Sequence, residues 1–175
     1  MADTNQELLG LAAYLLSYPN EQWLAAFPEA KEQIASLETE ATRTVLTDVV
    51  AYIEGELPKA YEDEYVRVFD FSQNTNLYLA SYDCSAAGEQ AEKLLKFKEL
   101  YERNGFDVAS ELPDYVPALL ELCATVDAKE AYRIGHTIKP YLELLRQRLI
   151  DSKQVHAFVL DVVLNEIERW EREAQ

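Results

Sequence analysis

Apolar side chains recur at helical spacing near the end of the printed sequence, over residues 155–170. Their separations of three, four, seven and eight positions place them on one face of an α-helix: Val155, Phe158, Val159, Val162, Val163, Ile167 and Trp170. Four charged residues interrupt the run and are expected on the opposite face: Asp161, Glu166, Glu168 and Arg169. A stripe this broad has to be covered by other elements, so the chain is expected to build a core from packed helices.

The same period extends over most of the chain, and no stretch shows the alternation typical of strands. It predicts further helical segments over residues 4–17, 28–37, 39–54, 58–69, 77–82, 85–103, 113–125 and 128–150. A polar, turn-like loop is expected at 70–76. Only 5 Gly and 6 Pro occur in 175 residues, too few for an all-β chain that turns every ten residues or so. We therefore expect one all-α domain, residues 1–175, folded as a bundle of about eight helices.

Four residues are expected to set helix boundaries. Thr4 fits the N-cap of a capping box that Glu7 completes, and Pro28 fits the first position of a helix. Gly55 is expected to end the helix over 39–54. Pro140 falls inside 128–150 and should kink or split that helix, because proline lacks an N–H and crowds the preceding turn.

The apolar run at residues 8–16 (LLGLAAYLL) could be mistaken for the core of a signal peptide. Residues 1–7 contain Asp3 and Glu7 but no Lys or Arg, so the cationic flank of such a peptide is missing. Nine residues are also far fewer than the roughly 20 that span a bilayer. We interpret the run as a buried helix and expect a cytoplasmic protein without direct membrane insertion.

The charge balance restricts the partners. Asp and Glu number 32 against 16 Lys and Arg, which gives a net charge of −16. Such a field repels nucleic-acid phosphates and anionic membranes, and it attracts basic partners. Nucleic-acid binding is therefore not expected.

The sequence contains no motif that predicts a metal or nucleotide site. The chain has two histidines, His136 and His156, and the residues three positions before them are Arg133 and Lys153. The Glu-x-x-His pairs of di-iron bundles are thus missing. Zinc-protease, phosphate-loop, dinucleotide and nucleophile-elbow motifs are missing as well. We expect no metal, no cofactor and no enzymatic activity, with a small helical enzyme as the remaining alternative.

The two cysteines, Cys84 and Cys123, are not part of a C-x-x-C motif. Two buried thiols in a reducing compartment are favoured over a disulfide. A Cys–His nucleophile pair cannot be recognised from sequence, because such partners meet only in space.

One segment, residues 111–121, is an unusual way to begin a helix. Pro113 and Pro117 stand four positions apart, where the first turn tolerates proline. Asp114 is expected near the positive end of the helix dipole, with Glu121 two turns further on the same face. Together with Tyr115 these groups would present acidic and aromatic chemistry. An ordinary proline-initiated helix start explains the same residues.

The sequence of this segment, E-L-P-D-Y-V-P-A-L-L-E, resembles the signature E-x-P-D-H-x-P-x-x-L-E of the TorD/DmsD/NarJ family of molybdoenzyme maturation chaperones. Residues 65–70 (YVRVFD) resemble the family's Y-x-x-L-F-D. Residues 15–19 (LLSYP) and the stretch 88–95 resemble runs of the NarJ branch. The chain departs from the signature at Tyr115, where the family often has histidine, so a role that needs a titrating imidazole is not carried over.

The resemblance implies a TorD-like helical fold and a nitrate reductase assembly chaperone. Such a chaperone binds the basic, amphipathic N-terminal leader of the apo catalytic (alpha) subunit. It holds that subunit until the molybdenum cofactor and the iron–sulfur cluster are inserted and the enzyme docks at the membrane. The family also implies a monomer or a domain-swapped dimer. A dimethyl sulfoxide, trimethylamine N-oxide or formate dehydrogenase-type client is the alternative within the family.

The predicted leader site follows from these motifs and from helix-in-groove recognition. Apolar anchors and a charged rim make up the site: Tyr65, Phe69, Leu112, Pro113, Tyr115, Pro117 and Leu120 as anchors, with Asp70, Asp114 and Glu121 as the rim. Plain core packing is the alternative for Tyr65, Phe69 and Leu120, because helical spacing does not distinguish a groove from an interior.

Overall fold

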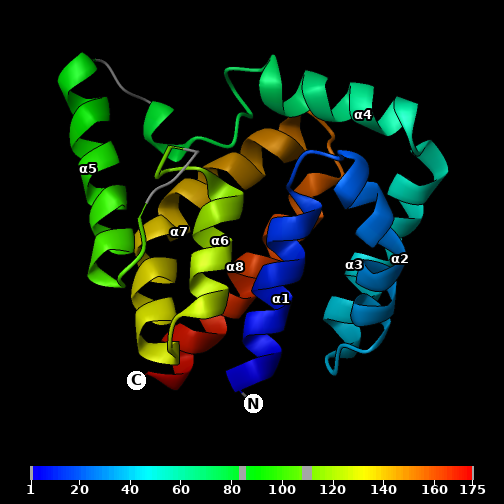
Figure 1. The fold of residues 1–175 in the computed structure, drawn as a ribbon, viewed down its shortest axis with the longest axis horizontal. Coiled ribbons are helices and arrows are strands. Elements are labelled where there is room, and N and C mark those ends of the chain that lie inside the picture. The colour runs from blue at the N-terminus through cyan, green and yellow to red at the C-terminus, as the bar shows by residue number, and fades with distance from the viewer. Residues whose placement is uncertain (1, 83–85, 108–111, 175) are drawn as a thin grey trace.

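The computed structural model describes residues 2–82, 86–107 and 112–174. This part of the chain forms eight α-helices: α1 Ala2–Leu15, α2 Glu21–Ala35, α3 Glu40–Glu56, α4 Lys59–Tyr65, α5 Ala87–Arg103, α6 Val116–Thr125, α7 Ala128–Asp151 and α8 His156–Glu173. A π-helical turn, Val66–Asp70, continues α4, and a 3₁₀ turn covers Leu79–Ser81. The described residues contain no β-strand, and the prediction of an all-α fold is confirmed (Figure 1).

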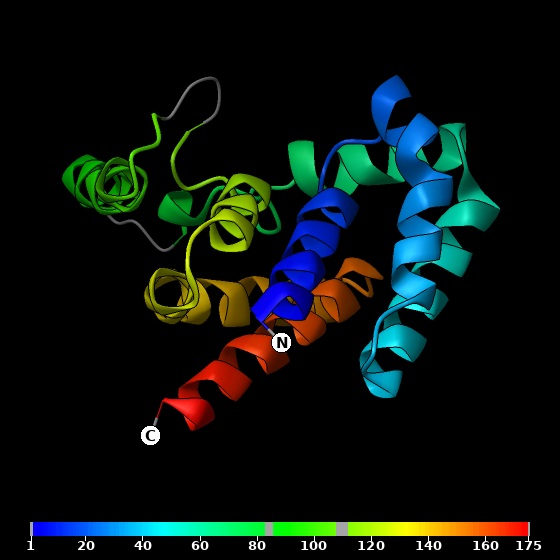
Figure 2. The same cartoon turned by 60° about the horizontal axis from the view of Figure 1, so that its bottom comes forward.

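Helix α1 lies in the middle of the bundle and packs against α6 and α8. Helices α7 and α8 form an antiparallel pair, α2 and α3 lie on one side, and α5 lies on the other (Figures 1 and 2). Helix α4 runs across one end of the bundle, at the top of Figure 1. The leucines of the run 8–16 are all buried, as predicted: Leu8, Leu9, Leu11, Leu15 and Leu16. No described helix combines the length and the apolar character needed to cross a membrane.

Two predicted helix starts are wrong. Helix α1 begins at Ala2, so Thr4 lies inside it and not at its N-cap position. Helix α2 begins at Glu21, because the Asn20 side chain caps it by accepting a hydrogen bond from the Trp23 N–H at 2.8 Å. Pro28 therefore lies inside α2. Buried side chains on both sides of the proline hold the helix together despite the lost hydrogen bond: Trp23, Phe27, Ala30 and Ile34.

Gly55 does not end its helix as predicted, and of the two outcomes expected at Pro140, a kink or a split, the split does not occur. Helix α3 runs through Gly55 to Glu56 and stops before Pro58, which keeps Leu57 in an extended conformation. Helix α7 is a continuous element of 24 residues with Pro140 inside it. Ile138 and Leu142 are fully buried on either side of that proline, so packing keeps the helix in one piece.

The apolar stripe of α8 is confirmed for four central residues, which are buried: Val159, Val162, Val163 and Ile167. Two assignments on this helix are wrong. Phe158 is 53% exposed, and Glu166 is buried. Burial of the Glu166 carboxylate is compensated because it accepts hydrogen bonds from the Trp170 indole N–H at 2.8 Å and from the Arg169 guanidinium.

Candidate peptide-binding site

The π-helical turn after α4 places two aromatic side chains inside and one carboxylate outside. Tyr65 and Phe69 are 2% and 3% exposed, and their ring centroids lie 4.8 Å apart. The Tyr65 hydroxyl donates a hydrogen bond to the Leu16 carbonyl oxygen at 2.7 Å, which ties the turn to the end of α1. Asp70, the last residue of the turn, is exposed. π-Helical turns are rare and occur frequently at functional sites.

Helix α6 begins later than predicted, at Val116, with Pro117 in its first turn. Asp114 therefore precedes the helix, and its side chain is only 1% exposed. One carboxylate oxygen accepts a hydrogen bond from the Ala80 backbone N–H at 2.8 Å. Burial raises the pKa of Asp114 above its ordinary value. The placement of Asp114 on a charged rim is thus wrong, because this carboxylate connects two loops inside the protein.

The two loops are also joined through their backbones. An isolated antiparallel bridge pairs Tyr78 with Tyr115. The Leu79 N–H donates to the Asp114 carbonyl at 3.2 Å, and the Val116 N–H donates to the Leu77 carbonyl at 2.9 Å. This arrangement sets the rings of Tyr78 and Tyr115 5.1 Å apart, centroid to centroid.

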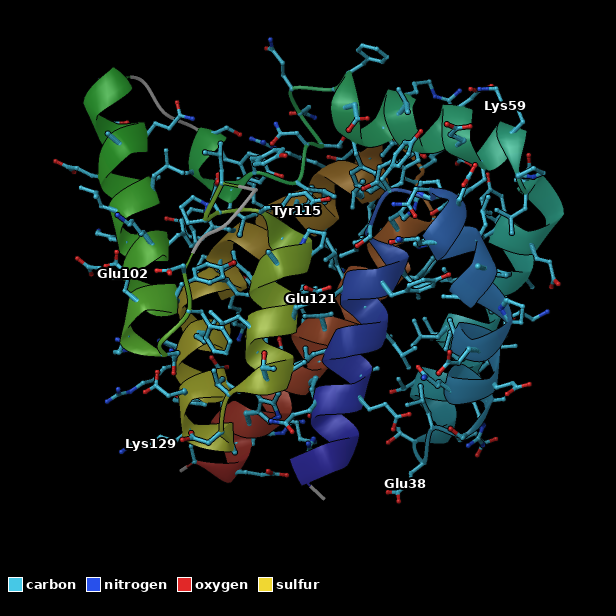
Figure 3. All side chains as sticks on the ribbon, in the orientation of Figure 1. Glu38, Lys59, Glu102, Tyr115, Glu121 and Lys129 are labelled. Atoms are coloured by element: carbon cyan, nitrogen blue, oxygen red, sulfur yellow. The ribbon has the colours of Figure 1, made fainter. Side chains whose placement is uncertain are left out.

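These elements enclose a cavity of about 170 Å³, which we call the aromatic hollow. Seven residues line it: Tyr18, Tyr65, Phe69, Asp70, Leu77, Tyr78 and Tyr115. The Tyr18 ring meets Tyr65 edge to face at 5.6 Å, and its hydroxyl donates to the Glu62 carboxylate. Figure 3 shows Tyr115 at the end of α6 that faces α4, and Glu121 further along α6.

Four of the ten predicted site residues line the aromatic hollow: Tyr65, Phe69, Asp70 and Tyr115. Tyr65, Phe69 and Leu120 are all buried in the hydrophobic core, as the core-packing alternative expected, and Pro117 is buried as well. Leu112 is 51% exposed, Pro113 is half-buried, and Glu121 is exposed; none of the three lines the hollow.

Three lining residues, Tyr18, Leu77 and Tyr78, were not among the predicted site residues. Tyr18 belongs to the run LLSYP, which resembles a run of the NarJ branch but was not assigned to the leader site. Leu77 and Tyr78 belong to a segment with no motif of its own. Their adjacency to Tyr115 depends on the Asp114 connection across 34 residues, for which the sequence contains no local signal.

The charge state of the hollow is set by its tyrosines and by one carboxylate. Burial strongly raises the pKa of the Tyr65 phenol, which stays neutral at ordinary pH. Among the described residues that line the hollow, Asp70 alone carries a carboxylate. The described lining of the hollow thus offers a bound group aromatic side chains and one negative charge.

Neither a metal centre nor a reactive thiol is evident in the described part of the chain. No group of His, Cys, Asp and Glu side chains that could hold a metal ion occurs there. Cys123 is buried, and burial raises the pKa of its thiol to about 12, so it remains an unreactive thiol. The predicted burial is thus confirmed for Cys123, whereas Cys84 lies outside the described residues.

Comparisons with known proteins identify similar chains. Residues 21–157 match the family described as nitrate reductase delta subunit. The nitrate reductase molybdenum cofactor assembly chaperone NarJ of Bacillus subtilis is 32% identical over 155 residues, which cover 88% of this chain and 84% of NarJ. The chaperone NarW of Escherichia coli, which bears the same description, is 26% identical over 90% of this chain and 67% of its own.

A third relative is much longer. The nitrate reductase-like protein NarX of Mycobacterium tuberculosis is 30% identical over 126 residues, which cover 70% of this chain but only 18% of NarX. The match therefore concerns one part of that protein.

Proposed function

Because the chain belongs to the nitrate reductase delta subunit family, we propose that it is an assembly chaperone that binds the N-terminal leader of the apo catalytic subunit of nitrate reductase. It acts in the cytoplasm and holds that subunit until the molybdenum cofactor and the iron–sulfur cluster are inserted and the enzyme docks at the membrane. NarJ and NarW are named as chaperones, and this chain is likewise a chaperone and not an enzyme.

The observation that carries the proposal is the composition of the aromatic hollow. Three segments that resemble family motifs, 15–19, 65–70 and 111–121, each contribute lining residues: Tyr18, then Tyr65, Phe69 and Asp70, then Tyr115. These segments are far apart in the sequence, and packing brings them to one place. A shared surface for binding accounts for this convergence.

The charge of the chain supports a basic ligand. A net charge of −16 attracts a cationic leader, and Asp70 offers a carboxylate at the hollow. The hollow is too small for a whole helix, so it would accept an anchoring side chain. The remainder of an amphipathic leader would lie on the surface around it.

The proposal is tested by isothermal titration of the protein with a synthetic peptide of the first 15–20 or so residues of the cognate catalytic subunit. We expect binding that Tyr115→Ala weakens by about tenfold or more, since aromatic anchors carry much of an interface's affinity. Phe158→Ala is the matched control, because Phe158 is exposed on α8 and does not line the hollow. Urea unfolding of both variants separates loss of binding from loss of fold.

Two results would change the proposal. If the leader does not bind but a twin-arginine signal peptide of another molybdoenzyme does, the client is different and the chaperone role stands. If no leader binds, the proposed function is wrong.

A further inference from the structure

The aromatic hollow has the dimensions of a site for one side chain. Its volume of about 170 Å³ is below the roughly 300–1,000 Å³ of pockets that enclose whole small molecules. Five of the seven described residues that line it are aromatic, and Asp70 adds a carboxylate. Aromatic ring faces carry negative electrostatic potential and attract cations, and boxes of such rings recognise ammonium and guanidinium groups.

Two of the tyrosine hydroxyls in the hollow are engaged elsewhere. The Tyr65 hydroxyl donates to the Leu16 carbonyl oxygen, and the Tyr18 hydroxyl donates to the Glu62 carboxylate. Tyr65 is only 2% exposed, so of these two residues Tyr18, which is 38% exposed, is the one whose ring a ligand can reach. Asp70 is exposed and forms no ion pair within residues 2–82, 86–107 and 112–174, so its charge is available to a ligand.

The alternatives to a cationic ligand are unfavourable at this position. An aliphatic side chain would remove water from the Asp70 carboxylate without giving it a partner. An anionic side chain would meet Asp70 in a protein of net charge −16. A guanidinium group suits both the aromatic side chains and the carboxylate of the hollow, because it is planar, stacks on aromatic faces and binds a carboxylate through its N–H groups.

We propose that the aromatic hollow binds one arginine side chain of the leader, with the guanidinium against the tyrosine rings and paired with Asp70. This inference rests on the proposed function and specifies which kind of leader side chain enters the hollow. The anchor in the hollow is a single cationic residue, and the apolar face of the leader lies outside.

The test replaces each arginine of the leader peptide, one at a time, by citrulline, which keeps the shape of arginine but is neutral. We expect one position at which citrulline weakens binding by about ten- to thirtyfold, the range for a desolvated cation on aromatic rings. Lysine at that position should restore part of the affinity. Asp70→Asn should weaken the arginine peptide but leave the citrulline peptide nearly unchanged.

Asp48→Asn is the matched control for charge. Asp48 is exposed on α3 and does not line the hollow, so this variant removes the same charge from a distant position. Equal effects of Asp70→Asn and Asp48→Asn would show that only the overall charge matters, and that result would overturn the arginine anchor. Unchanged affinity of every citrulline peptide would overturn it as well, while leader binding itself would stand.

A second measurement does not depend on the leader. N-acetyl-arginine methylamide and its citrulline counterpart are titrated into the protein while the tyrosine ring protons are followed by NMR. We expect the arginine compound, and not the citrulline compound, to shift the signals of Tyr18, Tyr78 and Tyr115. Equal shifts, or no shifts with either compound, would contradict the arginine site. Failure of all leader peptides together with a positive arginine result would instead point to a different client.

Discussion

The Asp114 carboxylate accepts a hydrogen bond at 2.8 Å from the backbone N–H of Ala80, a residue 34 positions earlier in the chain. The connection is reinforced by the backbone bridge between Tyr78 and Tyr115. Asp114 is buried and does not line the aromatic hollow. It therefore acts on the hollow indirectly, as a positioning residue that keeps Tyr115 beside Tyr78.

Replacement of Asp114 by alanine should lower both stability and leader binding. Alanine removes the hydrogen bond between the Ala80 N–H and the Asp114 carboxylate inside the protein, which costs about 1–3 kcal/mol in the free energy of unfolding. Asp114→Asn keeps a side-chain oxygen as the acceptor and should cost about 1 kcal/mol or less. Urea unfolding measures both variants. Wild-type stability of Asp114→Ala would show that the connection does not hold the two loops.

His156 should make the protein less stable as the pH falls. Its ring is fully buried at the start of α8, and the Tyr61 hydroxyl is 2.9 Å from Nε2. Burial lowers the pKa of His156 from 6.5 to about 4. His156 takes up a proton at higher pH in the unfolded chain than in the folded protein. The stability that its neutral, buried form contributes is therefore fully present above pH 6.5 and is lost as the pH falls to about 4. The loss amounts to roughly 3 kcal/mol.

Urea unfolding of wild type and His156→Phe between about pH 7.5 and pH 4.5 checks this dependence. The variant should have the shallower slope, whatever its stability at neutral pH. Phe158→Ala, which replaces an exposed side chain that has no titratable group, is the control and should keep the wild-type slope. The raised pKa of Asp114 acts in the opposite direction, because its contribution is present at low pH and lost as the pH rises. The test is therefore the difference between variants.

Gly135 should respond to alanine differently from Gly10. Both lie inside helices, where alanine is favoured over glycine by about 0.5–1 kcal/mol. A Cβ at Gly10 would meet nothing within 4 Å, whereas one at Gly135 would lie 3.1 Å from the Trp170 ring and 3.2 Å from Ile167. We expect Gly10→Ala to stabilise the protein and Gly135→Ala to lose that gain through crowding between α7 and α8. Equal increases in thermal midpoint would show that the helix pair relaxes freely.

Salt should slow association with the leader. If the net charge of −16 steers a basic peptide, the association rate should fall by about tenfold or more between about 20 mM and about 500 mM salt. The dissociation rate should change much less, because short-range contacts in the hollow control it. Stopped-flow fluorescence with a labelled leader separates the two rates. A salt-independent association rate would exclude electrostatic steering.

The local pattern of the sequence was sufficient for the helical class of the fold and for much of its core. Buried positions such as Leu9, Leu15, Val159 and Val163 repeat with the period of a helix, so neighbouring residues alone identify them. Helix ends were less predictable. Pro28 and Pro140 act as breaks in an isolated segment, but packed neighbours hold α2 and α7 through them, whereas α3 ends one residue after Gly55.

The residues of the candidate site were likewise predictable from the sequence only in part. Motifs in the sequence identified Tyr65, Phe69, Asp70 and Tyr115, which all line the aromatic hollow. The burial of Asp114 and the contribution of Tyr18 and Tyr78 depended on the tertiary structure alone. Helical spacing specifies which face of an element a residue occupies, but not which distant element that face meets. That choice is made when α1 packs against α6 and a buried carboxylate finds its partner 34 residues away, and both contacts are non-local.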